Sequence, residues 1–168
     1  MLGVRLPRGG HARASVYGSV NLPERLLKPP PEGLVLMGSL PQQDLFSAFE
    51  SADVLVFPTL LDGFGMVIAE AFSRGLPVIT TEKAGASQLV EHGRNGLIVP
   101  AASAAAITDA LQWCLDNRRA LYQMRFQAVE TARRWQWSDY RRLLVDKIAG
   151  KLGLVGCTAE WSRSTSAF

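Results

Sequence analysis

The segment from Ala52 to Thr81 constrains the fold more than any other part of this chain, because it reads as strand, glycine loop, helix and strand. Val54 to Phe57 is a short apolar run, which is typical of a strand buried on both faces of a parallel sheet. Helical spacing follows from Met66 to Arg74, and Gly75 stands where a helix C-cap glycine belongs. With the next strand at Val78 to Thr80, this order predicts an α/β unit built on a parallel sheet.

The loop between this first strand and the helix has the composition of an anion site. Gly63 and Gly65 allow backbone angles that are closed to other residues. A strand that enters a helix through such a loop directs free N–H groups at one spot, and these groups stabilise an exposed anion by about 0.3–1 kcal/mol. Asp62 at the loop entrance and Glu70 on the helix add carboxylates, which accept hydrogen bonds from hydroxyl groups. The pattern therefore predicts a ligand that carries both phosphate and hydroxyl groups.

This same stretch resembles the Glu-x7-Glu motif of retaining glycosyltransferases with the GT-B architecture, in the group 1 family. The family pattern is Pro-Ser/Thr-x-x-Glu-Gly-Phe-Gly-x-x-x-x-Glu-Ala followed by Gly-x-Pro-Val. This chain carries in register Pro58-Thr59, Gly63-Phe64-Gly65, Glu70-Ala71 and Gly75-Leu76-Pro77-Val78. Residues 83–100 are similar to the family segment Gly-Gly-x-x-Glu-x-Val-x-x-Gly-x-Asn-Gly, and residues 38–53 match the stretch leading into the motif strand. Several motifs in the right order, over roughly residues 33–145, make the resemblance specific.

The resemblance implies the fold and the domain organisation. A GT-B enzyme has two Rossmann-like domains with the active site between them, and 168 residues have room for one. We expect the C-terminal, donor-binding domain in truncated form. It would be an α/β, three-layer domain with a parallel sheet of about five strands, helices on both faces and a helical C-terminus. Residues 14–150 would form this domain, residues 1–13 would be poorly ordered and residues 151–168 would be a loose tail.

The resemblance also assigns roles to single residues. Glu70 stands at the second Glu of the motif, which holds the ribose hydroxyls of the nucleotide. Asp62 stands at the first Glu, which contacts the donor sugar, and is the candidate catalytic residue although Asp is shorter by one methylene. Backbone amides near the helix start face the phosphates or the donor sugar in the family, which here assigns donor binding to Gly63, Phe64, Gly65, Met66 and Val67. Candidates for contact with the nucleobase are Gly38, Ser39 and Leu40.

The function implied is sugar transfer from a nucleoside diphosphate sugar with retained configuration. An acceptor domain or chain would be a partner, and the isolated chain is expected to be inactive. No cofactor or metal is expected, because the sequence has no Asp-x-Asp pair and the helix start supplies the electrostatic stabilisation.

A nucleotide-sugar binding module or pseudoenzyme without transfer activity is the main alternative. Three departures from the family favour it: Asp62, Gln88 at a family Glu, and the missing Arg–Lys pair that opens the family's donor domain. Arg5 and Arg8 are the local candidates for that pair, and their spacing is wrong. A dinucleotide-binding domain is disfavoured because the loop lacks a third spaced glycine. An isomerase sharing the GT-B fold stays open.

Composition adds limits on location and partners. No apolar run approaches the ~20 residues that span a bilayer, and two cysteines fit no metal or disulfide framework, so we expect a cytoplasmic protein. A net charge of +3 does not argue for nucleic acid. A solvated helix face is the favoured interpretation of the basic residues near the end of the chain. Contact with the inner face of an anionic membrane is the alternative, for Arg133, Arg134, Arg141, Arg142 and Lys147.

Periodicity and caps predict further elements on both sides of the central unit. Ser103 is a good N-cap for the first of three C-terminal helices. The expected strands are 14–20, 33–37 and 97–99, and the expected helices are 21–28 (one or two turns), 43–52, 87–91, 104–117, 118–135 and 138–148.

Overall fold

The computed structural model describes residues 1–6, 12–19, 29–135, 145–146 and 148–151. The chain divides into two units, Met1–Ala132 and Arg133–Phe168. In the second unit, the structure describes the last residues of helix α4, Trp135, and helical residues at 145–146 and 148–151. The predicted boundary between residues 150 and 151 stays a prediction. The predicted helices at 21–28 and, for most of its length, 138–148 lie outside the described residues.

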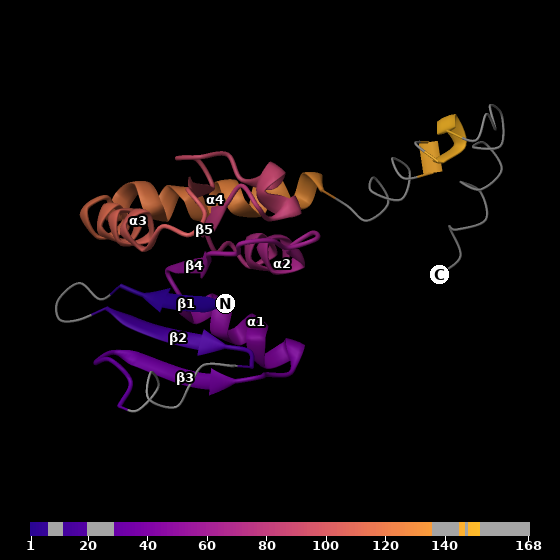
Figure 1. Ribbon diagram of the computed structural model, residues 1–168. Coiled ribbons are helices and arrows are strands. Elements are labelled where there is room, and N and C mark those ends of the chain that lie inside the picture. Colours follow the sequence, from indigo (N-terminus) through magenta and orange to yellow (C-terminus); the bar gives the residue numbers. More distant parts are fainter. Residues whose placement is uncertain (7–11, 20–28, 136–144, 147, 152–168) are drawn as a thin grey trace. The chain divides into compact units, whose positions relative to one another are not determined.

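The first unit is built on a six-stranded sheet with the order β3-β2-β1-β4-β5-β6 (Figure 1). Five strands run in one direction, because β2 and β3 are parallel, β4, β5 and β6 are parallel, and β1 is antiparallel to both β2 and β4. The predicted Rossmann-like α/β fold is confirmed, with β1 as an added antiparallel strand. The strand bounds are β1 Leu2–Arg5, β2 Arg13–Tyr17, β3 Leu34–Gly38, β4 Val54–Phe57, β5 Val78–Thr81 and β6 Gly96–Val99.

Strand β1 lies inside the segment that we expected to be poorly ordered, and that prediction is wrong for Leu2–Arg5. Val4 and Leu6 are each 3% exposed, and the backbone of Leu2 pairs with β2 on one side and β4 on the other. Leu6 N–H also donates to Asp53 Oδ2 at 2.7 Å. The seven residues between β1 and β2 are too few for a parallel crossover, which needs about a dozen, so β1 enters the sheet antiparallel.

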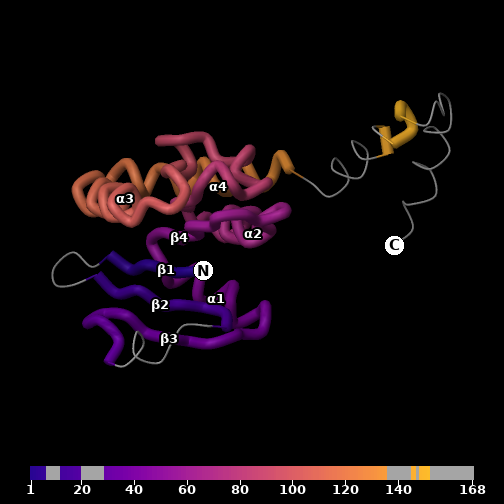
Figure 2. The backbone as a smooth tube through the Cα atoms, viewed as in Figure 1, coloured from indigo at the N-terminus to yellow at the C-terminus, as the bar shows by residue number. Residues whose placement is uncertain are grey.

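Helices cover both faces of the sheet. Alternate residues of a strand point to opposite faces, so each central strand contributes apolar side chains to both layers. Val54 and Val56 pack in one core cluster with Cys114 of α3, whereas Leu55 packs in the other with Phe72 of α2. Helix α2 lies between α1 and α4 (Figure 2). The bounds are α1 Gln42–Ser51, α2 Met66–Ser73, the 3₁₀ helix η2 Gly85–Leu89, α3 Ala104–Asp116 and α4 Arg118–Arg134.

The caps that the sequence predicts are present. Gly75 has φ +64° and its N–H donates to the Phe72 carbonyl at 3.0 Å, which ends α2. Ser103 Oγ accepts from Ala106 N–H at 3.2 Å and begins α3. The helix expected at 87–91 is the 3₁₀ helix η2, which has the same length and begins two residues earlier, at Gly85. Local signals thus fix the ends of the elements that flank the candidate site.

Candidate functional site

The predicted site lies where β4 leaves the sheet and α2 begins, at the carboxyl edge of the parallel strands. Two buried hydroxyls of the neighbouring strand β5 hold this exit. Thr80 Oγ1 donates to the Phe57 carbonyl at 2.9 Å, and Thr81 Oγ1 donates to the Thr59 carbonyl at 2.7 Å. Sequence reasoning missed both threonines, because a strand pattern does not show which hydroxyl faces a neighbouring carbonyl. The start of the loop is therefore tied to the sheet.

The glycine loop packs backbone against backbone on the start of η2. A Cβ on Gly85 would lie 2.5 Å from the Gly63 carbonyl oxygen, and Ala86 N–H donates to the Phe64 carbonyl. Gly65, the N-cap of α2, has φ +79°, and a Cβ there would lie 3.3 Å from the Phe57 ring. A side chain at Gly65 or Gly85 would displace the loop, so the two glycines fix where α2 begins.

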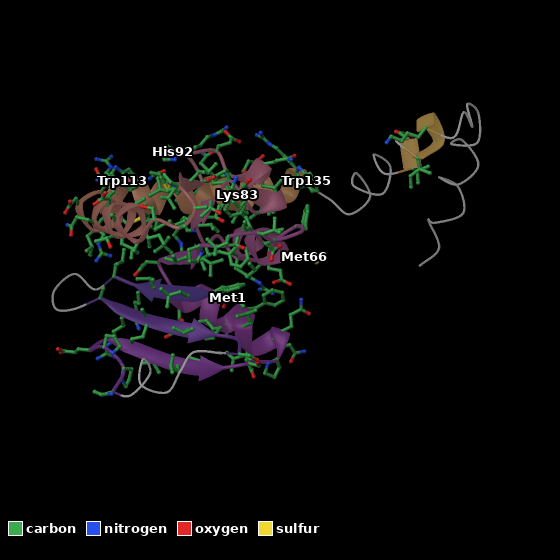
Figure 3. The ribbon with its side chains drawn as sticks, in the orientation of Figure 1. Met1, Met66, Lys83, His92, Trp113 and Trp135 are labelled. Atoms are coloured by element: carbon green, nitrogen blue, oxygen red, sulfur yellow. The ribbon has the colours of Figure 1, made fainter. Side chains whose placement is uncertain are left out.

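The loop and the first turn of α2 bring together the five residues predicted to present amides. Ile68 N–H donates to the Gly65 carbonyl at 2.9 Å, which closes the first turn of the helix. The amides of Met66 and Val67 come before this bond, where helical N–H groups have no partner within the helix. The Met66 side chain is exposed here (Figure 3). These amides lie at the positive end of the helix dipole, which suits an anionic ligand.

Asp62 is part of the loop's own hydrogen bonding. Its Oδ1 accepts from Phe64 N–H at 3.1 Å, so one of the five predicted amides is already paired within the loop. Its backbone N–H donates to the Lys83 carbonyl at 3.1 Å, and its backbone forms an isolated bridge with Ala84. The partly buried carboxylate therefore stabilises the loop, and one of its two oxygens has this structural partner.

Glu70 reaches from α2 to the start of α1. Its Oε1 accepts from Gln42 Nε2 at 3.1 Å, at the surface of the protein. Gln42 follows the loop of Gly38, Ser39 and Leu40 by one residue, Pro41. Strands β3 and β4 run in the same direction, so this loop and the loop before α2 leave the sheet at one edge. Glu70 thus connects the two predicted parts of the site.

Gln42 was not among the residues that the sequence singled out. It lies 28 positions from Glu70, and no local pattern links an exposed glutamine on one helix to a glutamate on the next. In the loop predicted to contact the nucleobase, Gly38 has φ +67°, and its carbonyl accepts from Gly18 N–H at 2.8 Å. This bond joins the ends of β2 and β3 beside the site.

The family model of glycosyl transferases group 1 matches residues 4–117. The chain belongs to this family. It is 32% identical over 106 residues to the D-inositol 3-phosphate glycosyltransferase of Corynebacterium urealyticum, which covers 63% of this chain and 25% of that protein. It is 36% identical over 95 residues to the protein of that name from Pseudarthrobacter chlorophenolicus, covering 56% of this chain and 23% of that protein. The chain thus spans about a quarter of the length of these relatives.

Solved structures of glycosyltransferases share the fold. Sucrose-phosphate synthase from Thermosynechococcus elongatus superposes with a TM-score of 0.63 at 22% identity, over 79% of this chain and 34% of that one. Anabaena HepE in complex with UDP superposes with a TM-score of 0.66 at 19% identity, over 81% of this chain and 40% of that one. These likenesses establish that this group 1 glycosyltransferase chain has the Rossmann-like fold of its family.

Other polar candidates lie outside the site or have structural roles. Arg5 pairs with Arg13, the first residue of β2, so it lies at the opposite, amino edge of the parallel strands, and Arg8 lies outside the described residues. His92 lies in the turn before β6, and its Nδ1 accepts from the N–H of Ile98 in that strand at 3.0 Å. Cys114 is a buried core thiol, and burial raises the pKa of this thiol to about 11.

The described residues show neither a metal-ligand cluster nor a membrane-spanning helix. In the part of the chain that the structure describes, no three or more His, Cys, Asp or Glu side chains gather as metal ligands would. Among the described helices, none is long and apolar enough to cross a membrane. The polar groups that the structure places at the predicted site are the amides at the start of α2 and the carboxylates of Asp62 and Glu70.

Proposed function

We propose that this chain is the donor-binding domain of a retaining glycosyltransferase and that it binds a nucleoside diphosphate sugar at the carboxyl edge of its sheet. The diphosphate would lie at the start of α2, Glu70 would accept from the ribose hydroxyls, and the loop of Gly38, Ser39 and Leu40 would contact the base. The observation that supports this most directly is the Gln42–Glu70 hydrogen bond. It connects helix α2 to the first residue of α1, which follows the loop of Gly38, Ser39 and Leu40. Membership of the glycosyl transferases group 1 family supports the proposal.

In the proposed reaction the chain orients the donor and stabilises the departing diphosphate. The amides of Gly65, Met66 and Val67 are fixed before the ligand arrives, so they stabilise developing charge without reorganisation. The free oxygen of Asp62 would accept from a hydroxyl of the donor sugar. The acceptor would come from a separate domain or chain, and without it the chain would not transfer sugar. No metal or other cofactor belongs to this proposal, and uridine nucleotides are the first donors to test, since the HepE structures contain UDP and UDP-glucose.

A second candidate function is nucleotide-sugar binding without transfer. The pairing of Asp62 Oδ1 with Phe64 N–H supports it, because a carboxylate that holds its own loop has less freedom to follow a reacting sugar. Asp is also one methylene shorter than the family's Glu, which is about 1.5 Å of reach. Misplacement by about 1 Å can cost about 100-fold in rate. Both candidates share the donor site and differ only in the chemical step.

We propose a cytoplasmic location, with no nucleic acid among the partners. Contact with the inner face of the membrane is a further possibility for the basic end of α4, where Arg133 and Arg134 are exposed. Three other residues predicted for that patch, Arg141, Arg142 and Lys147, lie outside the described residues. Sedimentation with vesicles containing anionic lipid tests this contact, and equal recovery with neutral vesicles would contradict it.

The proposed donor site is tested by calorimetric titration with UDP-, GDP- and ADP-sugars. We expect one of these to bind the wild-type chain, and Glu70→Ala to weaken that binding about tenfold or more, because a carboxylate that accepts from hydroxyls contributes about 1.5–3 kcal/mol. Preference for NAD, or equal binding by Glu70→Ala, would contradict the proposal. Co-expression with an acceptor domain, followed by a transfer assay, then separates the enzyme from the binding module.

A further inference from the structure

Helices α1 and α2 are joined by two polar contacts that differ in position. Near the carboxyl edge of the sheet, Gln42 Nε2 donates to Glu70 Oε1 at 3.1 Å. At the other end of α1, Arg74 Nη1 donates to Glu50 Oε1 at 3.2 Å, and the Arg74 guanidinium lies 4.4 Å from the centre of the Phe46 ring. The Arg74–Glu50 pair with its ring contact joins the two helices at the surface, away from the proposed ligand. The Gln42–Glu70 contact is the one beside the proposed ligand.

An ionised carboxylate only accepts hydrogen bonds, so Gln42 must present its amide nitrogen to Glu70. The two carboxylate oxygens together offer about four acceptor positions, and Gln42 occupies one of them on Oε1. Oε2 and the remaining lone pair of Oε1 stay available for two ribose hydroxyls. The contact therefore orients Glu70 without filling it.

A free glutamate on a helix surface samples several rotamers, and ordering it on binding costs free energy. Gln42 limits this freedom before the ligand arrives. Gln42 itself is held in place because it is the first residue of α1. The first turn of this helix is closed by Leu45 N–H, which donates to the Pro41 carbonyl at 3.0 Å. The nucleobase loop ends at Leu40, so any change in that loop reaches Glu70 through Pro41 and Gln42.

We propose that Gln42 is a positioning residue, which holds the Glu70 carboxylate in the orientation that accepts hydrogen bonds from the ribose of the donor nucleotide. This inference rests on the proposed function. Gln42 need not touch the ligand itself, and its effect is specific to ligands whose hydroxyls use Glu70.

The test uses the full chain and four variants: Gln42→Ala, Gln42→Glu, Glu70→Ala, and Glu50→Ala as the matched control for the other inter-helix contact. Each is titrated with whichever of UDP, GDP and ADP the wild type binds most tightly, and with the 2′,3′-dideoxy analogue of that nucleotide. Thermal unfolding of each variant shows that it is folded.

We expect Gln42→Ala to weaken binding of the ribonucleotide about three- to tenfold, the range for one hydrogen bond, and to change binding of the dideoxy analogue by less than about twofold. Gln42→Glu should weaken the ribonucleotide more, because two adjacent carboxylates repel each other and displace Glu70. Glu50→Ala should leave both affinities unchanged.

Two results would overturn the inference while the proposed donor site stands: Gln42→Ala weakens both ligands equally, or it weakens neither while Glu70→Ala still weakens the ribonucleotide. A wild-type chain that binds none of the three nucleotides, or a Glu70→Ala variant that binds like wild type, would instead remove the proposed function and this inference with it.

Discussion

The two halves of the sheet differ in how they are organised. From β4 to β6, each strand runs parallel to the last, the connections contain α2 and η2, and buried residues pack on both faces. In the other half, β1 is antiparallel to its neighbours, and the edge strand β3 exposes Val35, Leu36 and Met37 by 38–49%. Only the half from β4 to β6 carries the glycine loop. The parallel half therefore builds the loop's local geometry, although its neighbour β1 runs antiparallel to it.

The largest expected contrast is between core truncations in the two halves. Phe72→Ala in α2 removes a fully buried ring and should lower the free energy of unfolding by about 3–5 kcal/mol. Leu36→Ala in β3, where 38% of the residue is already exposed, should cost less than about 1.5 kcal/mol. Urea unfolding followed by circular dichroism measures both values. Equal losses would show that the two halves are packed alike.

The glycine loop gives the next contrast. Gly85→Ala should destabilise the chain by about 2–3 kcal/mol, because its Cβ would lie 2.5 Å from the Gly63 carbonyl oxygen. Gly63→Ala is the matched control, since a Cβ there meets nothing within 4 Å. Urea unfolding is the measurement again. If Gly85→Ala is as stable as Gly63→Ala, the loop does not need the close backbone contact.

Strand β1 is the place where the comparison can be broken. Val4→Ala should cost about 1–2 kcal/mol, because Val4 packs in the core cluster with Val54 and Val56. Hydrogen exchange should also show the amides of β1 protected to the same free energy as those of β4, since both strands belong to one sheet. Rapid exchange in β1 together with slow exchange in β4 would show that β1 is not an integral strand.

The smallest effect concerns Cys114, which is buried in α3 and packs in the core cluster with Val54 and Val56. Burial raises the pKa of its thiol from 9.0 to about 11, so between these pH values the folded chain keeps a proton that the unfolded chain has lost. The thiol's contribution to stability is complete below pH 9 and is lost as pH rises toward 11. We expect stability to fall more in wild type than in Cys114→Ala over this window. The free energy of unfolding is measured for both proteins at pH 8.5, 9.5 and 10.5. An identical change with pH in wild type and Cys114→Ala would contradict this.

The sequence predicted well wherever chemistry is local. Gly75 and Ser103 end and begin helices through bonds within a few residues, and both caps are where the sequence placed them. The apolar run of β4 likewise gave its bounds. These elements need no knowledge of distant partners, which is why periodicity and turn chemistry were sufficient.

The remainder required long-range contacts. Strand β1 is only four residues with a glycine among them. It is stabilised by backbone pairing with β2 on one side and β4 on the other, and β4 lies far from it in the sequence. The partner of Glu70 lies 28 positions away, and the hydroxyls of Thr80 and Thr81 bond to carbonyls 22 or more positions away. The sequence indicated Asp62 as a catalytic candidate, and it could not show that Phe64 N–H already occupies one of its oxygens.

The central claim is that a nucleotide binds at the carboxyl edge, between the start of α2 and the loop after β3. The most direct test is titration of the ¹⁵N-labelled chain with UDP, GDP or ADP while the backbone amide resonances are recorded. The account predicts that the largest shifts fall on Gly65, Met66 and Val67 and on Gly38 and Ser39, with Arg5 and Arg13 at the amino edge unchanged. Shifts that cluster at the amino edge, or that leave the start of α2 unaffected while a nucleotide binds, would contradict it.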